Sequence, residues 1–282
     1  MEKISIQILG SAAAEGIPAL FCDCPLCQYA WEHKGKDVRK RTAYKINDRV
    51  RLDFGPDSMA QEFEYDLHSE RLKHIFITHP HTDHLTSTEF TWRMPGFSHV
   101  PEDKLLNVYG SQGVVQTIKS FFGERLANAR LNPVVIKPFE AFDLPDEDQT
   151  WYPMPADHMY ENPAGEPFIY AVRLGKKYML VANDTGYFSE AVWKFLEEKH
   201  FVFDLVISDC TGAMKDQEHG HMSGRFVLAV KERLEKIGCI TGDTRYFINH
   251  FSHNGRATHA QLEEHFNPYG IEVGYDGLEI SF

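Results

Sequence analysis

The sequence predicts an α/β (α+β) fold in which two packed β-sheets carry helices on their outer faces. Two observations lead to this fold class. The early strand-like segments follow one another in hairpin fashion, whereas the later ones alternate with helical patterns, a mixture that a purely parallel sheet would not produce. In addition, 43% of the 282 residues are hydrophobic and 25% are charged, which is ordinary for a globular protein with a sizeable buried core.

The strand-like segments are rich in Val, Ile, Phe and Tyr, and turn residues flank most of them. They lie at residues 3–9, 42–46, 50–54, 74–78, 106–109, 134–137, 168–174, 178–182 and 205–208. Helical patterns lie between them at residues 58–67, 112–122, 189–199 and 223–236. The last pattern is the clearest, because apolar residues recur at helical spacing from Phe226 to Leu234 and Gly238 comes just past its end.

No internal repeat, low-complexity tract or linker divides the chain, so we expect one domain over residues 1–282. Two loops look long, at residues 10–41 and 85–105, and the first carries a cysteine-rich segment. No stretch approaches the roughly 20 apolar residues of a membrane span, and the first residues lack the pattern of a signal peptide. We therefore expect a cytoplasmic protein that does not bind membranes.

The formal net charge of −12 argues against nucleic acid as a partner, because proteins that bind polyanions usually carry a basic surplus. The net charge describes the surface of the whole molecule. Bound divalent ions would reverse the local field inside a cleft, so the net charge says little about a metal site.

The strongest signal for function is a group of metal-binding side chains directly after the strand-like residues 74–78. His79, His81, Asp83 and His84 fall within six positions. Imidazole and carboxylate suit Zn²⁺, Mn²⁺ or Fe²⁺. One tetrahedral ion cannot easily take all four groups from so short a loop, whereas two ions about 3.5 to 4 Å apart could divide them.

This His-x-His-x-Asp-His loop resembles the hallmark of the metallo-β-lactamase superfamily. The resemblance extends to residues 52–57, which look like the strand-turn element that supports the metal loop, and to the segments around His158, Asp184 and His250. It implies a four-layer αββα sandwich with two divalent metals, Zn²⁺ or Mn²⁺. By this resemblance one metal is held by His79, His81 and His158, the other by Asp83, His84 and His250, and Asp184 bridges the two.

A cysteine cluster narrows the resemblance. Cys22, Cys24 and Cys27 supply three thiolates, one short of a closed tetrahedral zinc site, and His253 could be the fourth ligand. This combination resembles the PhnP-like phosphodiesterases, which implies a structural zinc that pins the loop at residues 10–41.

The segment at residues 218–223 opens the clearest helical pattern. It resembles the place where phosphodiesterases of the superfamily, ribonuclease Z included, keep a histidine near the scissile phosphate. His221, followed by Ser223 as a helix N-cap, fits best, and His219 competes with it. Asp83 and His221 are therefore the expected catalytic residues. The candidates for a phosphate contact are Arg93, Arg173, Arg225 and Arg245, and the sequence does not select among them.

The resemblance implies a metal-dependent phosphodiesterase for a small cyclic phosphate or nucleotide-like phosphodiester, in which a hydroxide bridging the two metals attacks phosphorus. Two alternatives stay open. One is tRNA processing of the ribonuclease Z type, and the other is a non-hydrolytic carrier like a pyrroloquinoline quinone biosynthesis protein. The resembling enzymes often dimerise, so a homodimer is a further expectation.

Overall fold

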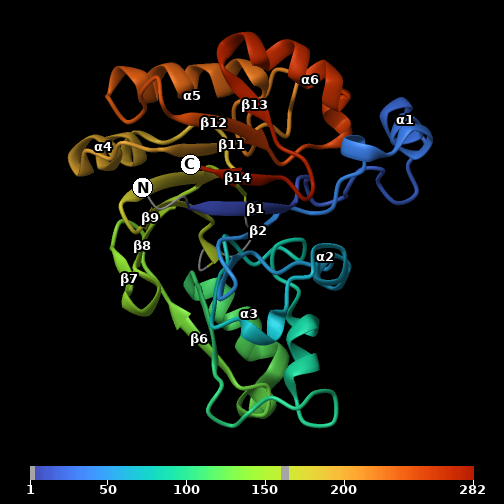
Figure 1. Cartoon of the computed structure of the whole chain (residues 1–282), viewed down its shortest axis with the longest axis vertical. Coiled ribbons are helices and arrows are strands. Elements are labelled where there is room, and N and C mark those ends of the chain that lie inside the picture. Colours follow the sequence, from blue (N-terminus) through green and yellow to red (C-terminus); the bar gives the residue numbers. More distant parts are fainter. Residues whose placement is uncertain (1–3, 160–164) are drawn as a thin grey trace.

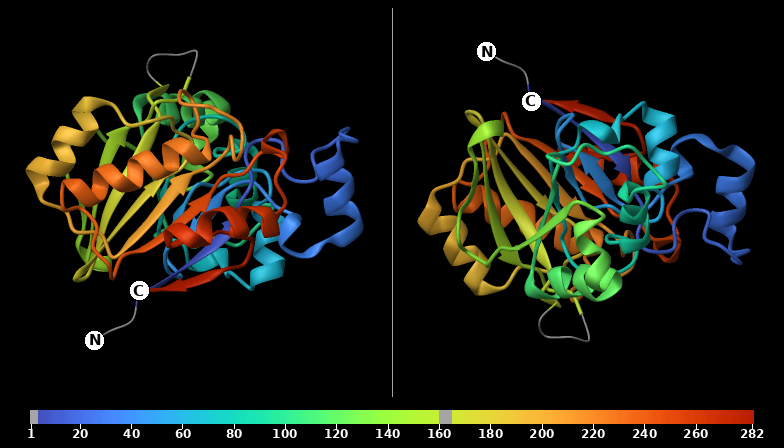
Figure 2. Two further views of the ribbon diagram at one scale, coloured as in Figure 1. Left: turned by 90° about the horizontal axis from the view of Figure 1, so that it is seen from above. Right: turned by 90° about the horizontal axis from the view of Figure 1, so that it is seen from below.

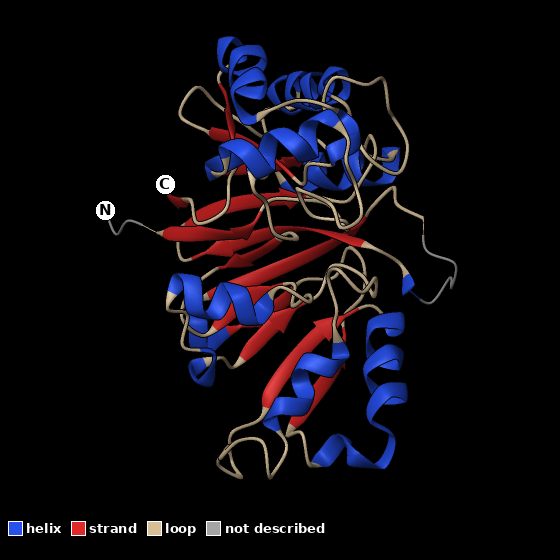
Figure 3. Ribbon diagram, turned by 90° about the vertical axis from the view of Figure 1, so that its right-hand side faces the viewer, coloured by secondary structure: helices blue, strands red, loops and turns tan. Residues whose placement is uncertain are grey.

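The computed structural model describes residues 4–159 and 165–282, and its centre is a pair of seven-stranded β-sheets packed face to face (Figure 1). Helices cover the outer face of each sheet, so that strands lie between helical layers above and below them (Figure 3). The predicted αββα order of layers is confirmed.

The first sheet has the strand order β14-β1-β2-β3-β4-β5-β6. Its strands β14, β1, β2 and β3 pair antiparallel, and β3 to β6 run parallel. Pro133 lies in β6, the edge strand, where a residue without an N–H group is tolerated. The bounds are β1 (Ser5–Gly10), β2 (Ala43–Lys45), β3 (Val50–Leu52), β4 (His74–Phe76), β5 (Leu106–Gly110), β6 (Leu131–Val135) and β14 (Glu279–Ser281).

The second sheet has the strand order β13-β12-β11-β10-β9-β8-β7. Strands β7 to β10 pair antiparallel, and β10 to β13 run parallel. Each sheet therefore has an antiparallel half and a parallel half. The bounds are β7 (Phe142–Leu144), β8 (Gln149–Pro155), β9 (Phe168–Leu174), β10 (Lys177–Ala182), β11 (Leu205–Asp209), β12 (Arg245–Asn249) and β13 (Ile271–Val273).

The helices divide between the two outer faces (Figure 2). Helices α2 (Ser58–Tyr65) and α3 (Gln112–Phe122) lie on the side of the first sheet, and α4 (Glu190–Lys199), α5 (Gly224–Lys236) and α6 (His259–Phe266) cover the second. Helix α1 (Pro25–His33) stands to one side of the sandwich, within the long loop that carries the cysteines. None of the helices in the described part of the chain combines the length and the apolar character that a bilayer crossing requires.

Three large apolar clusters and one small one fill the spaces between the layers. The cluster between the sheets is rich in aromatic rings, and at its centre Phe76 stacks on Trp151 with ring centroids 3.6 Å apart. Stacked aromatic rings of this size bury a large apolar area and fix the distance between the sheets. The other two large clusters join α3 to the first sheet and α4, α5 and α6 to the second.

Some elements differ from those expected. The strand expected at residues 134–137 lies at Leu131–Val135, because the edge position of β6 accommodates Pro133. Strands β7, β8, β12, β13 and β14 and helix α6 were not predicted, and helix α1 lies within the long loop expected at residues 10–41. A signal for α6 was available, since Thr258 and Gln261 form a reciprocal capping box at its start.

Candidate metal centre

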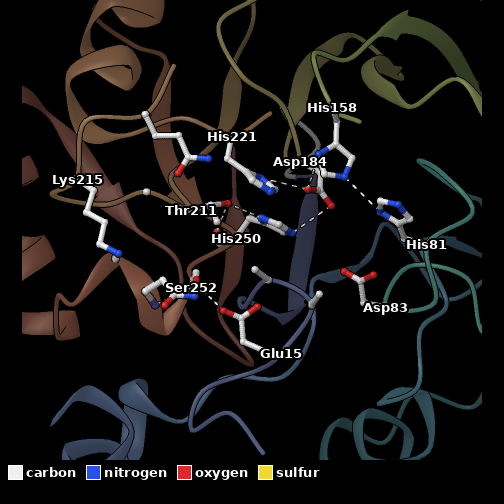
Figure 4. A pocket seen from close by; sticks show the side chains of 16 residues that line it. Glu15, His81, Asp83, His158, Asp184, Thr211, Lys215, His221, His250 and Ser252 are labelled. Carbon is white, nitrogen blue, oxygen red and sulfur yellow. Dashed lines mark hydrogen bonds and ion pairs between the residues drawn. The ribbon is translucent and has the colours of Figure 1, made fainter. Parts of the chain in front are cut away.

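A pocket of about 400 Å³ lies where loops from both sheets meet (Figure 4). The loop after β4 supplies His81 and Asp83, and the segments after β10 and β12 supply Asp184 and His250. Ligand sites in α/β sheets commonly lie outside the carboxyl ends of parallel strands, and these three strands all belong to parallel runs. The fold thus brings together side chains that are far apart in the sequence.

The first histidine cluster consists of His79, His81 and His158. The Nδ1 atom of His81 lies 2.8 Å from His79 Nε2 and 3.2 Å from His158 Nε2. His158 donates through Nδ1 to the Gly220 carbonyl at 3.1 Å, which leaves its Nε2 atom as the ligand toward the centre. Burial lowers the pKa of both His79 and His158, which favours the neutral imidazole that binds metals.

The second cluster consists of Asp83, His84, Asp184 and His250, and all four residues are buried. His84 Nε2 lies 3.0 Å from an Asp83 oxygen and 2.7 Å from an Asp184 oxygen. His250 Nε2 lies 3.3 Å from the same Asp184 oxygen. Asp184 also approaches the first histidine cluster, with 3.6 Å to His79 Nε2, so its carboxylate lies where it could bridge two ions.

The charges of the second cluster balance one another. Burial opposes protonation of His84, but the Asp83 and Asp53 carboxylates outweigh it and raise the pKa of His84 well above its usual value. Burial likewise opposes protonation of His250, and Asp184 together with Asp209 raises the pKa of His250 to about 10. Bound divalent ions would supply positive charge in place of these protons, because metal binding requires neutral imidazoles and ionised carboxylates.

Orphaned nitrogen atoms test whether the residues fit a metal pair. The Nε2 atoms of His84 and His250 are buried, and within the described residues neither has a hydrogen-bond partner of regular geometry. Buried polar atoms in native proteins are nearly always satisfied, so two such atoms aimed at one point call for an ion. The imidazole and carboxylate donors suit Zn²⁺ or Mn²⁺, and the site fits the expected pair.

Residues 52–57 support the metal loop. The Asp53 carboxylate accepts a hydrogen bond from the Thr78 backbone N–H at 2.8 Å and another from His84 Nδ1 at 2.7 Å. The second contact fixes the tautomer of His84, so that its Nε2 atom faces the centre. The turn itself packs closely on the loop, with Phe54 N–H bonded to the His84 carbonyl at 2.8 Å.

Asp209, at the end of β11, was missed by the sequence analysis. Its buried carboxylate accepts hydrogen bonds from the backbone N–H groups of Asp184 at 3.0 Å and Met222 at 2.9 Å. Its Oδ2 atom lies 3.3 Å from His250 Nδ1 and 3.5 Å from His221 Nδ1. Its place after the strand-like residues 205–208 resembles that of Asp184 after residues 178–182, but the sequence does not show its contacts with backbone N–H groups.

The two candidate histidines of residues 218–223 lie in different places. His221 lines the pocket, with Nδ1 at 3.3 Å from an Asp184 oxygen and a side chain 24% exposed. His219 pairs with Asp157 at 3.0 Å, and its side chain is 82% exposed. Burial opposes protonation of His221, but the hydrogen bond and charge of Asp209 outweigh it and raise the pKa of His221.

The four arginine candidates for a phosphate contact are not among the described residues that line the pocket. Arg93 donates to backbone carbonyls at Lys104 and Ala129, and the other three pair with carboxylates. Those partners are Asp148 for Arg173, Asp216 for Arg225 and Glu272 for Arg245. Among the described residues that line the pocket, the one lysine or arginine is Lys215.

The cysteine cluster consists of Cys22, Cys24, Cys27 and His253, whose ligand atoms all lie within 4.8 Å of one another. His253 Nδ1 is 3.3 Å from the Cys22 sulfur and 3.5 Å from the Cys24 sulfur. Burial opposes the thiolate of Cys24, but the contact with His253 outweighs it and lowers the pKa of Cys24 to about 6. A tetrahedral set of three sulfurs and one imidazole could hold a structural metal ion.

Comparisons with known proteins agree with this geometry. A family model described as a beta-lactamase superfamily domain matches residues 48–240. Among curated proteins, an octanoyltransferase of Porphyromonas gingivalis is 26% identical over 288 residues, 96% of this chain and 50% of that protein. The coenzyme PQQ synthesis protein B of Methylobacterium radiotolerans is 26% identical over 168 residues, 53% of this chain and 52% of that protein. The chain therefore spans about half the length of the curated relatives it matches.

Solved structures share the fold over the whole chain. A diphosphatase from the PhnP family has a TM-score of 0.74 and 21% identity, over 100% of this chain and 98% of that one. Zinc-bound PqqB from Methylobacterium extorquens has a TM-score of 0.76 and 16% identity, over 99% of this chain and 100% of that one. The short form of human tRNase Z has a TM-score of 0.63 and 17% identity, over 98% of each chain.

Proposed function

This chain belongs to the beta-lactamase superfamily, and from that premise we propose that it is a two-metal hydrolase of small phosphodiesters. The substrate class is a small cyclic phosphate or a nucleotide-like phosphodiester. The observation that carries the proposal is the convergence of the first histidine cluster, the second cluster and His221 on one open pocket. The fold that the chain shares with a PhnP-family diphosphatase is in keeping with it.

The proposed chemistry divides between the bound ions and the chain's own residues. When bound, a pair of divalent ions supplies a water of lowered pKa as the nucleophile and offsets the charge of the phosphoryl oxygens. Asp209 and Asp184 hold Nδ1 of His221, which leaves the opposite edge of the ring for the substrate. The hydrogen bond and charge of Asp209 raise the pKa of His221, and a protonated imidazole in this place would donate to the leaving oxygen.

A substrate panel tests the proposal. The protein is loaded with Zn²⁺ or Mn²⁺ and assayed against cyclic nucleotides, bis-(p-nitrophenyl) phosphate and precursor tRNA. We expect turnover of small phosphodiesters and no site-specific cleavage of the tRNA. Efficient cleavage of precursor tRNA would replace the proposal with a processing endonuclease, and hydrolysis of thioesters or lactams alone would remove phosphodiesters as the substrate class.

A substitution tests the role of His221. His221→Ala should lower kcat by about 10²-fold or more, because general acid catalysis typically contributes that much. The matched control is His219→Ala, which removes the exposed neighbour on the same loop and should leave kcat unchanged. Metal content is measured on all three proteins. Nearly full turnover by His221→Ala with metals bound would end the proposed role.

A second candidate function comes from the similarity to the PQQ synthesis protein. Two comparisons, one by sequence and one by structure, point to that group. A carrier of this type would bind its ligand without turnover. A preparation that saturates at one zinc ion per chain and hydrolyses none of the panel would favour the carrier over the hydrolase.

A further inference from the structure

Glu15 is a pocket carboxylate that belongs to neither metal cluster. It lies on the loop after β1, and in Figure 4 its side chain points into the pocket below His250. The Glu15 Oε1 atom accepts a hydrogen bond from the Ser252 hydroxyl and lies 3.5 Å from His253 Nε2. Its side chain keeps 30% of its surface exposed, so it is both anchored and accessible from the pocket.

The backbone around Glu15 is tied to the segment that carries His250. The Ala13 N–H donates to the Phe251 carbonyl at 2.9 Å, and the Phe251 N–H donates to the Ser11 carbonyl at 2.8 Å. These two bonds join the loop and the segment as a short ladder. Because Ser252 belongs to the same segment, the side chain and the backbone of Glu15 are both fixed to the segment that carries His250.

The cysteine cluster holds Glu15 from the other side. The His253 ring uses Nδ1 toward the sulfurs of Cys22 and Cys24, and its opposite nitrogen, Nε2, lies 3.5 Å from the Glu15 carboxylate and 3.4 Å from the Asn254 side-chain amide. A histidine that binds a metal through one nitrogen commonly donates its other N–H to a carboxylate. The position of Glu15 in the pocket therefore depends on the cysteine cluster.

A carboxylate in this place is unfavourable for a phosphodiester, because like charges repel in a partly enclosed pocket. Glu15 must then face a part of the substrate that carries no negative charge and offers hydrogen-bond donors. Lys215 lines the same pocket, which disfavours an ammonium group and leaves hydroxyl groups as the matching donors.

We propose that Glu15 determines specificity, by accepting hydrogen bonds from hydroxyl groups on the organic part of the substrate and by disfavouring a second anionic group. This inference rests on the proposed function, since it assumes that a phosphodiester occupies the pocket. Glu15 is a substrate-contacting residue, and Ser252 and the cysteine cluster position it.

Matched esters with one leaving group provide the test. The glyceryl, ethyl, aminoethyl and carboxymethyl esters of p-nitrophenyl phosphate differ only in the group that would face Glu15. For the wild type we expect kcat/KM to be about tenfold higher for the glyceryl than for the ethyl ester. One hydrogen bond to a charged group typically strengthens an interaction by about that factor. The carboxymethyl ester should be the poorest substrate. A preference for the aminoethyl ester over the glyceryl ester would overturn the choice of hydroxyl groups.

Two variants separate the charge of Glu15 from its capacity to accept hydrogen bonds. Glu15→Gln removes the charge and should raise the carboxymethyl-to-ethyl ratio about tenfold, whereas Glu15→Met should also abolish the glyceryl advantage. Ser252→Ala should shift the same ratios in the same direction by a smaller factor. The matched control is Glu140→Gln, a carboxylate on the exposed surface that should leave every ratio unchanged.

Binding of the corresponding phosphate monoesters to the metal-loaded proteins is measured by calorimetry as an independent readout. If the wild type hydrolyses no ester, the proposed function fails, and the order of affinities for glycerol phosphate, ethyl phosphate and phosphoglycolate still tests Glu15. Ratios that stay the same in Glu15→Gln and Glu15→Met, in turnover and in binding, would overturn the inference while leaving the proposed function intact.

Discussion

Three residues around the metal clusters adopt the left-handed backbone conformation that favours glycine. The φ angles are 64° for Asp53, 56° for Asp184 and 64° for His250. A residue with a side chain is strained there and persists in this conformation only when its surroundings fix it. Each of the three follows a strand, and the reversal of the chain at that point turns the side chain toward the centre.

One hydroxyl group fixes two of these positions. Tyr44, on β2 of the first sheet, donates to the Asn183 side-chain oxygen and accepts a hydrogen bond from the Asn249 side-chain amide at 2.8 Å. Asn183 directly precedes Asp184, and Asn249 directly precedes His250. A single buried side chain of one sheet thus stabilises the strained ligands of the other.

Tyr44→Phe should therefore weaken the second cluster more than the first. Removing the hydroxyl leaves two buried amide groups without their shared partner, and loss of such outer contacts typically lowers metal affinity by about 10- to 100-fold. Metal titration of the two sites, read against the wild type, measures the difference. The control is Tyr109→Phe, which removes another buried hydroxyl in the same apolar layer, bonded to His74. Equal weakening of both clusters would contradict this account.

At the scale of elements, the turn after β3 lies directly on the metal loop. A side chain on Gly55 would place its Cβ atom 1.9 Å from the Asp83 carbonyl oxygen. Backbone atoms leave no room for it, so one of the two segments would have to shift.

Gly55→Ala should displace Asp83 and reduce the metal content of the second cluster, together with a fall in Tm. Metal analysis and thermal unfolding measure the two effects. Gly242→Ala is the matched control, because a Cβ atom there would meet nothing within 4 Å. If Gly55→Ala keeps its full metal content, the metal loop accommodates the added methyl group and this prediction is wrong.

A histidine in helix α6 makes the stability of the fold depend on pH. Burial and the charge of Arg39 lower the pKa of His259 to about 4, and the neutral ring accepts a hydrogen bond from Arg39 at 2.9 Å. The unfolded chain binds this proton at the ordinary pKa of 6.5, so the contribution to stability is present above that pH and is lost as the pH falls toward 4.

We expect the free energy of unfolding of the wild type to lose on the order of 3 kcal/mol from this residue over that range, and His259→Gln to lose much less. Denaturant unfolding at a series of pH values measures both. The buried carboxyl of Asp276, whose pKa is raised to about 6, has the opposite sign, so the difference between the two proteins isolates His259. His265→Gln, on the same helix, is the control, and parallel curves for wild type and His259→Gln would contradict the assignment.

For the whole molecule, the predicted metal content is about three ions per chain. Chelators should remove the two ions held by the first and second clusters, and the ion in the cysteine cluster should remain. Cys27→Ser should lower the count by one and also lower Tm, whereas Cys210→Ser, at a buried cysteine outside the cluster, should leave the count unchanged. Metal analysis before and after dialysis against a chelator gives the numbers.

The sequence predicted the site residues that lie in a recognisable motif or at a characteristic place in the order of the chain. His79 to His84 form a dense local motif, and His158, Asp184 and His250 follow it in the chain order that the resemblance requires. Asp209 was missed because its carboxylate binds backbone N–H groups, which leave no mark in the sequence. The place of Arg173 could not be predicted for a related reason, since its pairing with Asp148 depends on how the strands align.

The layers of the fold were predicted correctly, but the set of predicted strands was incomplete. Strand β12 was missed because its apolar run is only Tyr246 to Ile248, too short to distinguish from a loop. Its place is set by the neighbours, because parallel pairing to β11 and β13 satisfies its backbone on both sides. The sequence favoured His221 over His219, and the three-dimensional course of their loop places His221 at the pocket and His219 at the surface.

Each metal cluster takes ligands from both sheets. His79 and His81 follow β4 of the first sheet and His158 follows β8 of the second, and the other cluster is divided in the same way. Strands β1 to β6 precede the second sheet in the chain, so a nascent chain that has formed only these strands holds two of the three residues of the first cluster and two of the four of the second. Both ligand sets are complete only when the two sheets have come together, so metal binding at these clusters is a measure of correct folding.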